Sequence, residues 1–200
     1  MELSQKLEID RCPHCQVARP DTRLLGQHQT TNHSGAMQRK WAVYCCSSCG
    51  GLTTAWSLAF GAPVVDYFPK NTTVDEAVPE RPRTYLQQAI ESLHAPAGAV
   101  MLAASAIDAM LKLKSYEEGT LYERIEAAAK DHLITVEMAR WAHAVRLDAN
   151  GQRHADQAAT LPTQDEAKIT IDFVRAFAQF LFVLPAQIDN GLQQAEPKSG

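Results

Sequence analysis

Two cysteine motifs constrain this chain more than any other feature of its sequence. Cys12 and Cys15 form one C-x-x-C pair, Cys46 and Cys49 form a second, and thirty residues separate the pairs. Two such pairs typically bring four thiolates around one tetrahedral ion, which is the pattern of a structural zinc site. Because four sulfurs leave no open position for water, we expect zinc to shape this part of the chain and to take no part in catalysis.

The fifth cysteine and three histidines leave the ligand set open. Cys45 could replace Cys46 as a ligand, and His14, His28 or His33 could replace one of the cysteines. The cysteines could also be free thiols or a redox pair, but a thioredoxin-like site requires a βαβ pattern, and neither pair lies in one. The sequence therefore favours zinc bound by the four cysteines of the two pairs.

The residues around the second pair predict a small β-structure. Segments 41–45 and 52–56 are rich in aromatic and β-branched residues and predict the two strands of a hairpin, to which 64–68 could add a short edge strand. Residues 61–82 contain four prolines, which indicates a linker or a wrapping loop. We therefore predict a zinc ribbon over residues 1–60.

From residue 83 onward the apolar residues recur with helical spacing, which predicts a helical bundle. Capping residues and prolines place five helices, at 83–94, at 96–113, at 121–131, from Thr135 onward, and from Thr163 to Pro185. The second of these is apolar on nearly all sides and is expected at the centre. The predicted fold class is thus mainly α, a five-helix bundle over 83–190 preceded by the small β zinc ribbon, with 191–200 as a tail.

The charge distribution bears on the ligand class and on the location of the protein. The formal net charge is −4, so the chain as a whole is no basic nucleic-acid coat, but residues 1–60 carry six Lys/Arg and four Asp/Glu. We therefore expect the ribbon to make the first contact with any nucleic acid. The start lacks an apolar signal core, and no apolar run approaches the roughly 18 residues that span a membrane, so a cytoplasmic protein without a membrane partner is expected.

A polar arc marks the predicted fourth helix. Within the run WAHAVRLDANGQRHAD, the side chains of His143, Arg146, Asn150 and His154 fall on one arc about 80° wide if the run is helical. Imidazole and guanidinium groups handle protons and phosphate, so a phosphate-handling site is one interpretation. Two others stay open: Asn150 and Gly151 could end the helix with a left-handed cap, or the arc could be a polar network that fixes helix packing.

Asp108 lies in the most apolar helix, where a buried carboxylate needs a partner. Arg146 is the expected partner if the second and fourth helices pack together. The alternatives are a carboxylate at the water-exposed rim of the helix and a structural ion pair.

Four segments of the helical part resemble those of an uncharacterised bacterial domain family that recurs in restriction and anti-phage proteins. They are AASAIDAML, residues 121–133, WAHAVRLDANGQRHAD and FLFVLPAQI. That family is similar to a branch of the HEPN superfamily of helical domains, and its members often begin with a zinc ribbon. The resemblance implies a HEPN-like, defence-associated protein. It would be either a metal-independent endoribonuclease or an inactive module that binds nucleic acid or a protein partner.

The HEPN catalytic pattern is an arginine followed, after four to six residues, by a histidine, often with an asparagine directly after the arginine. Asn150 and His154 match the asparagine and histidine, whereas seven residues separate Arg146 from His154. The resemblance implies that His154 would transfer protons, Arg146 would stabilise charge on the phosphate and Asn150 would orient it. Because the arginine is displaced, the sequence favours the non-catalytic binding module.

The resemblance also implies a homodimer through the helical part, since HEPN-like domains usually pair so that two polar faces share one cleft. The last predicted helix adds an independent hint. It carries four aromatic rings, more than one helix face of a small bundle needs to bury: Phe173, Phe177, Phe180 and Phe182. The ribbon or the linker could cover these rings instead.

Overall fold

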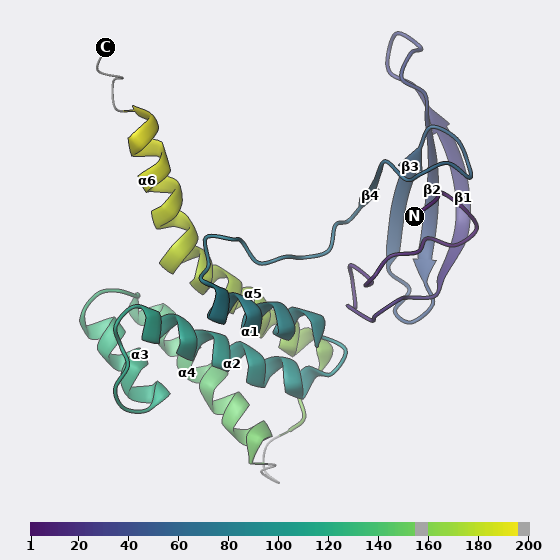
Figure 1. Ribbon diagram of the computed structural model, residues 1–200. Helices are drawn as coiled ribbons and strands as arrows, with labels where there is room; N and C mark the ends of the chain where they lie inside the picture. The colour runs from purple at the N-terminus through teal and green to yellow at the C-terminus, as the bar shows by residue number, and fades with distance from the viewer. Residues whose placement is uncertain (155–159, 196–200) are drawn as a thin grey trace. The chain divides into compact units, whose positions relative to one another are not determined.

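The computed structural model describes residues 1–154 and 160–195, and the chain divides into two compact units (Figure 1). The first unit, Met1–Thr72, contains the β-structure, and the second, Thr73–Gly200, contains the helices. Each unit has its own hydrophobic core, and each is described by itself below.

The β unit is an antiparallel sheet in which neighbours in sequence are neighbours in space. Its described strands are β1 (Thr22–Thr30), β2 (Arg39–Cys46), β3 (Leu52–Ser57) and β4 (Asp66–Phe68). The predicted hairpin is confirmed as β2 and β3, and the predicted edge strand is confirmed as the shorter β4. Strand β1 was not predicted, because its sequence TRLLGQHQT alternates poorly and the register shifts between Leu24 and Gly26.

The N-terminal segment covers one face of this sheet. Leu3, Leu7 and Ile9 are buried against a row of inward-facing residues from β2 and β3, namely Ala42, Tyr44 and Ala55. The phenolic oxygen of Tyr44 donates a hydrogen bond to the carbonyl of Ser4 at 2.7 Å. Because side chains alternate across a strand, the residues between these inward positions project from the opposite face.

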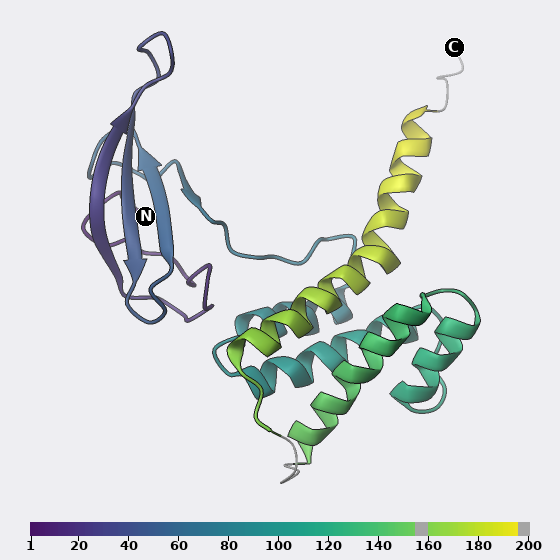
Figure 2. The same ribbon diagram turned by 180° about the vertical axis from the view of Figure 1, so that it is seen from behind.

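The helical unit forms the elements that the capping signals predict (Figure 2). The described residues contain α1 (Glu80–Glu91), α2 (Pro96–Leu113), α3 (Leu121–Lys130), α4 (Val136–Arg153), α5 (Gln164–Ala178) and α6 (Leu184–Ala195). Thr120 and Thr163 form full capping boxes at α3 and α5, and the side chain of Thr135 caps α4. Helix α1 begins one turn earlier than predicted, because Pro82 fits the first turn, where it needs no donated hydrogen bond.

Helix α2 is the central helix, as the sequence predicts. It packs against α1, α4 and α5, and most of its residues are buried. Many of its buried residues are alanines, including Ala99, Ala103 and Ala106, which let neighbouring helices approach closely. The apolar sides of α4 and α5 close the same core, with Val145 and Phe177 almost fully buried.

The predicted end of the last helix at Pro185 is wrong. A π-helical segment, Gln179–Val183, follows α5, and α6 continues to Ala195, so residues 191–195 are helical and not part of a tail. Proline has no N–H and its ring collides with an α-helical backbone one turn earlier, and a wider π turn relieves both problems. With this junction, α5 and α6 form one rod, and the described bundle has five helices. Residues 196–200 lie outside the described residues.

Two helices among the described residues are long and apolar enough to cross a membrane by length and composition alone, α2 and the rod Gln164–Ala195. The expectation that no stretch of this kind exists was therefore too strict. However, 50% of the apolar window of α2 and 44% of that of the rod are buried inside the protein. Core helices of a folded bundle show burial of this kind, and the cytoplasmic location stays a prediction.

Candidate functional site

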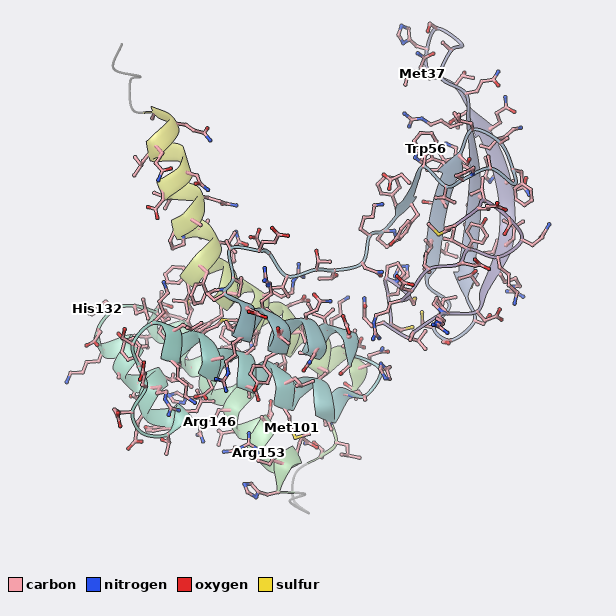
Figure 3. The ribbon with its side chains drawn as sticks, viewed as in Figure 1. Met37, Trp56, Met101, His132, Arg146 and Arg153 are labelled. Atoms are coloured by element: carbon pink, nitrogen blue, oxygen red, sulfur yellow. The ribbon has the colours of Figure 1, made fainter. Side chains whose placement is uncertain are left out.

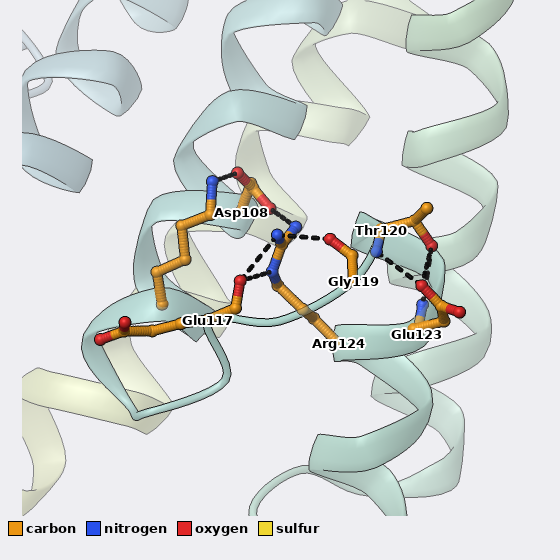
Figure 4. Close-up of polar contacts among 7 residues, drawn as sticks. Asp108, Glu117, Gly119, Thr120, Glu123 and Arg124 are labelled. Carbon is orange, nitrogen blue, oxygen red and sulfur yellow. Dashed lines mark hydrogen bonds and ion pairs between the residues drawn. The ribbon is translucent and has the colours of Figure 1, made fainter.

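The carboxylate of Asp108 on α2 is held by two cations (Figure 4). One oxygen accepts from Nη1 of Arg124 at 2.7 Å, and the other lies 2.6 Å from Nζ of Lys112, one turn along the helix. The predicted pairing with Arg146 is wrong, and so is the water-exposed rim, because the Asp108 side chain is only 24% exposed. The structural ion pair is confirmed, with a different arginine.

Arg124 pairs with Asp108 because the loop before α3 holds the Arg124 guanidinium toward α2. Its Nη2 donates to the carbonyls of Glu117 at 2.9 Å and Gly119 at 2.6 Å (Figure 4). The next residue of the loop, Thr120, forms the capping box with Glu123, and the backbone N–H of Thr120 lowers the pKa of the Glu123 carboxyl. The loop, the helix N-terminus and the ion pair thus form one rigid support.

Beside this support, α1, α2, α3 and α4 border an open cavity of about 750 Å³. Cationic side chains outnumber acidic ones in its lining. The cations are Arg81, Lys112, Arg124, Arg146 and Arg153, and the acids are Asp108 and Glu117. Among the uncharged lining residues, Tyr85, Ser105, Tyr122 and Asn150 offer hydroxyl or amide groups. An arrangement of this kind attracts an anion and can donate hydrogen bonds to it.

Arg146 is a cation of this cavity that contacts an aromatic ring and has no acidic partner among the described residues. Its Cζ lies 5.4 Å from the ring centroid of Tyr122, and Tyr122 in turn stacks on His143 at 4.7 Å. Nε2 of His143 lies 2.7 Å from a carboxylate oxygen of Glu126, which fixes the imidazole. Within residues 1–154 and 160–195, Arg146 has no ion pair, and its buried Nε has no hydrogen-bond partner. A buried donor without a hydrogen-bond partner costs about 1–3 kcal/mol, so a ligand that accepts a hydrogen bond from this guanidinium would offset that cost.

The polar arc of α4 is partly assembled at this cavity. Helix α4 runs through Asn150 and Gly151 to Arg153, so the predicted left-handed cap is wrong. Arg146 and Arg153, both labelled in Figure 3, line the cavity together with Asn150. His154 is exposed just beyond the last helical residue and is not part of the lining. The arrangement can therefore bind a phosphate through a guanidinium and an amide.

Several cations of the cavity were not predicted from the sequence. Arg153 could have been found, because it lies seven positions after Arg146 and two turns of helix return to the same face. Lys112 could have been found as the i+4 neighbour of Asp108. Arg81 and Arg124 come from other helices, and no signal in the sequence places them beside α4.

The four cysteines of the two pairs form a separate cluster in the β unit. Their sulfur atoms all lie within 4.8 Å of one another, and Sγ of Cys12 is 3.8 Å from Sγ of Cys49. Zinc–sulfur bonds of about 2.3 Å in a tetrahedron place the sulfurs about 3.8 Å apart. The cluster therefore fits a zinc ion held by Cys12, Cys15, Cys46 and Cys49.

The backbone around each pair supports negative charge on the sulfurs. Gln16 and Gly50 adopt positive φ values of 60° and 74°, and their N–H groups bond to the carbonyls of Cys12 and Cys46. This fold turns the amides of His14 and Gly51 toward cysteine sulfurs at 3.4 Å. Burial and neighbouring sulfurs raise the pKa of the Cys49 thiol to about 12, so a bound cation is needed to keep the cluster ionised near neutral pH.

The alternative ligands lie outside the cluster. Cys45 directs its thiol to a backbone carbonyl, and Nε2 of His14 lies 2.7 Å from the carbonyl of Leu52. The His14 ring also packs on Gly51, where an added Cβ would come within 2.4 Å of it. His28 and His33 are exposed and do not join the four sulfurs.

Residues 87–195 match the model of a family described as "Domain of unknown function (DUF4145)". The chain belongs to the DUF4145 family. No curated protein and no solved structure matches it. The DUF4145 match includes every cavity-lining residue except Arg81 and Tyr85, and it excludes the cysteine cluster. The cavity is thus a feature of the DUF4145 domain, whereas the cysteine cluster lies in a part of this chain that precedes that domain.

Proposed function

We propose that this protein is a HEPN-like, defence-associated module that binds nucleic acid without cleaving it, and that it holds a backbone phosphate in the cavity beside α4. The observation that carries the proposal is Arg146, a half-buried guanidinium in a cation-rich cavity without an acidic partner among the described residues. A phosphate has the charge and the oxygen geometry that a guanidinium binds with two parallel hydrogen bonds.

The lining favours binding over catalysis. General acid–base chemistry needs a group that can accept a proton within reach of the substrate. Among the described residues, no histidine lines the cavity. Both oxygens of Asp108 are already engaged by Arg124 and Lys112. Glu117, at the rim, is exposed, and in Figure 4 its carboxylate points away from Arg124. The cavity can thus bind an anion, but its described lining is poorly suited to general acid–base catalysis.

The HEPN-like and defence-associated parts of the proposal rest on the resemblance of four sequence segments. The described parts of these segments lie in or directly after α2, α3 and α4 and at the junction of α5 with α6, and α3 and α4 both pack against α2. The β unit would contribute a structural zinc and a second contact surface for nucleic acid.

The test is equilibrium binding of the full chain to fluorescein-labelled single-stranded RNA and DNA, measured by anisotropy. Arg146→Gln should weaken binding about tenfold or more, the typical value of a charge-assisted hydrogen bond. The matched control is Arg140→Gln, which removes an exposed arginine of the same helix that does not line the cavity. Equal affinities of the two variants would refute the cavity as the site, and no binding to any oligonucleotide would favour a protein ligand.

One observation favours an endoribonuclease as a second candidate. Arg146 and Asn150, two of the three residues implied by the HEPN pattern, line the same cavity one helical turn apart. His154 follows α4 directly and would have to swing toward the cavity to act as the acid or base. Cleavage that survives EDTA, leaves a 2′,3′-cyclic phosphate and falls at least about 100-fold in His154→Ala would establish this function. Intact RNA after prolonged incubation would exclude it for the RNA tested.

A further inference from the structure

The two faces of the β sheet differ in composition. The N-terminal segment packs on the face that carries Ala42 and Tyr44. The opposite face carries Trp41 and Trp56, and neither ring belongs to a hydrophobic core among the described residues. Phe68 on β4 lies on the same face, opposite Thr54, and is 45% exposed. A group of aromatic rings on one face that belongs to no core marks a candidate binding surface.

Trp41, Trp56 and Arg39 form a stacking surface on this face. Trp41 is paired across β2 and β3 with Trp56, which is labelled in Figure 3. Their ring centroids lie 6.0 Å apart and their planes are tilted by 41°. The guanidinium of Arg39 lies over the Trp56 ring, 4.5 Å from its centroid. Nε1 of Trp41 donates to Oγ1 of Thr30 at 2.9 Å, which fixes that ring. The surface is therefore ordered before any ligand arrives.

The charges on this face favour an anionic ligand. The strand register places Arg23 and His28 on the side of Trp41, together with Arg39. The acid at the edge of the face, Asp66, is already paired with Lys70. A zinc-loaded cysteine cluster would carry a charge of −2 near Arg23, which is paired with Cys45, but Trp41 and Cys46 are five residues apart on β2, or about 17 Å. That separation exceeds the Debye length of about 8 Å at physiological salt.

We infer that this face binds unpaired bases of a single-stranded nucleic acid. Bases stack on the aromatic rings and on the Arg39 guanidinium, while Arg23 and His28 lie where the phosphates between the bases can pass. A duplex hides the faces of its bases, so single strands are the preferred ligand. The inference rests on the proposal that the ligand is a nucleic acid, but it uses residues of the β unit and none of the helical cavity.

The test is quenching of tryptophan fluorescence by a short oligo(dT) and the corresponding oligo(U), with the full chain purified in the presence of zinc. A Trp141→Phe background removes the tryptophan of the helical unit, so that the signal reports on Trp41 and Trp56 alone. Single strands should quench this fluorescence, and a duplex of the same length should bind at least about fivefold more weakly.

Two substitutions distinguish the loss of base stacking from the loss of positive charge. Arg39→Gln and Phe68→Ala should each weaken single-strand binding by about fivefold or more and reduce the quenching at saturation. Lys40→Gln is the matched control, since it removes the neighbouring charge, which bonds to Gln29 and projects from the other face. Equal losses in Arg39→Gln and Lys40→Gln, or absence of quenching, would overturn the inference.

The cavity variant separates the two proposals. Arg146→Gln should lower the affinity and leave the quenching at saturation unchanged. If Arg146→Gln has no effect on affinity while Arg39→Gln reduces the quenching, the face binds bases and the cavity proposal fails alone. If Arg146→Gln lowers the affinity while Arg39→Gln leaves the quenching unchanged, the inference about the sheet fails alone.

Discussion

At the scale of single residues, Arg124 organises the rim of the cavity. Its side chain is 11% exposed, and it joins Asp108 on α2 to two carbonyls of the loop before α3. We predict that Arg124→Met lowers the free energy of unfolding by about 2 kcal/mol, because the substitution removes charged hydrogen bonds and leaves Asp108 with Lys112 alone. Urea denaturation measures this change. Arg140→Met is the control, and a loss of similar size there would contradict the structural role of Arg124.

The residues that come together in a site were predictable where their spacing in the sequence is local. They were not predictable where their partners depend on tertiary packing. The cysteine spacing was enough to predict the four sulfurs that come together, because C-x-x-C is a local turn. The acid Asp108 was also found, but its partner was not. Several arginines could reach α2, and the choice depends on a loop whose shape comes from Gly119 at a positive φ of 76°. Likewise, Arg146 and Asn150 share the cavity, while the end of α4 leaves His154 outside it.

At the scale of elements, capping signals predicted helix starts better than prolines predicted helix ends. Thr120, Thr135 and Thr163 begin their helices as expected, because a side-chain oxygen that accepts from a backbone N–H is a short-range interaction. Pro185 does not end the last helix, because the preceding π turn rearranges the hydrogen bonds around it. Strand β1 was missed, since its long pairing with β2 is a tertiary contact.

The zinc site is a property of the β unit. We predict one zinc ion per chain, measured by elemental analysis, and loss of this ion when Cys12 and Cys46 are both replaced by serine.

Zinc affinity should rise with pH and fall on acidification, because protons compete for sulfurs whose pKa values are raised, as at Cys49. EDTA should unfold the β unit and leave the helical circular dichroism largely intact, since the units have separate cores. Protein that contains no zinc, or a double variant that keeps it, would contradict this site.

At the scale of the whole molecule, the surface of α6 bears on the expected homodimer. The prediction that four phenylalanines of the last helix form the dimer surface was partly wrong, because Phe173 and Phe177 are buried in their own bundle. A different stripe, Leu184, Ile188 and Leu192, is 41%, 61% and 62% exposed, and α6 has no buried residue. Figures 1 and 2 show this helix extending beyond the other helices of its unit. The stripe repeats every four residues, so the same face of a second copy can pack against it.

We predict that the protein is a dimer in solution and that Ile188→Asp makes it monomeric, because a charge at the centre of an apolar contact must be buried without a partner. Light scattering at tens of micromolar measures the mass. Asn190→Asp adds the same charge on another side of α6 and should leave the dimer intact. A monomeric mass for the unmodified chain would contradict the dimer.

The central claim is that Arg146 contacts a phosphate in the cavity, and the salt dependence of single-strand binding tests it most directly. Each phosphate contact releases bound counterions and adds about 0.7 to the slope of log affinity against log salt concentration. We predict that Arg146→Gln lowers this slope by about 0.7 relative to the unmodified chain, whereas Arg140→Gln leaves it unchanged. Parallel lines for the unmodified chain and Arg146→Gln would show that this arginine touches no phosphate and would contradict the account.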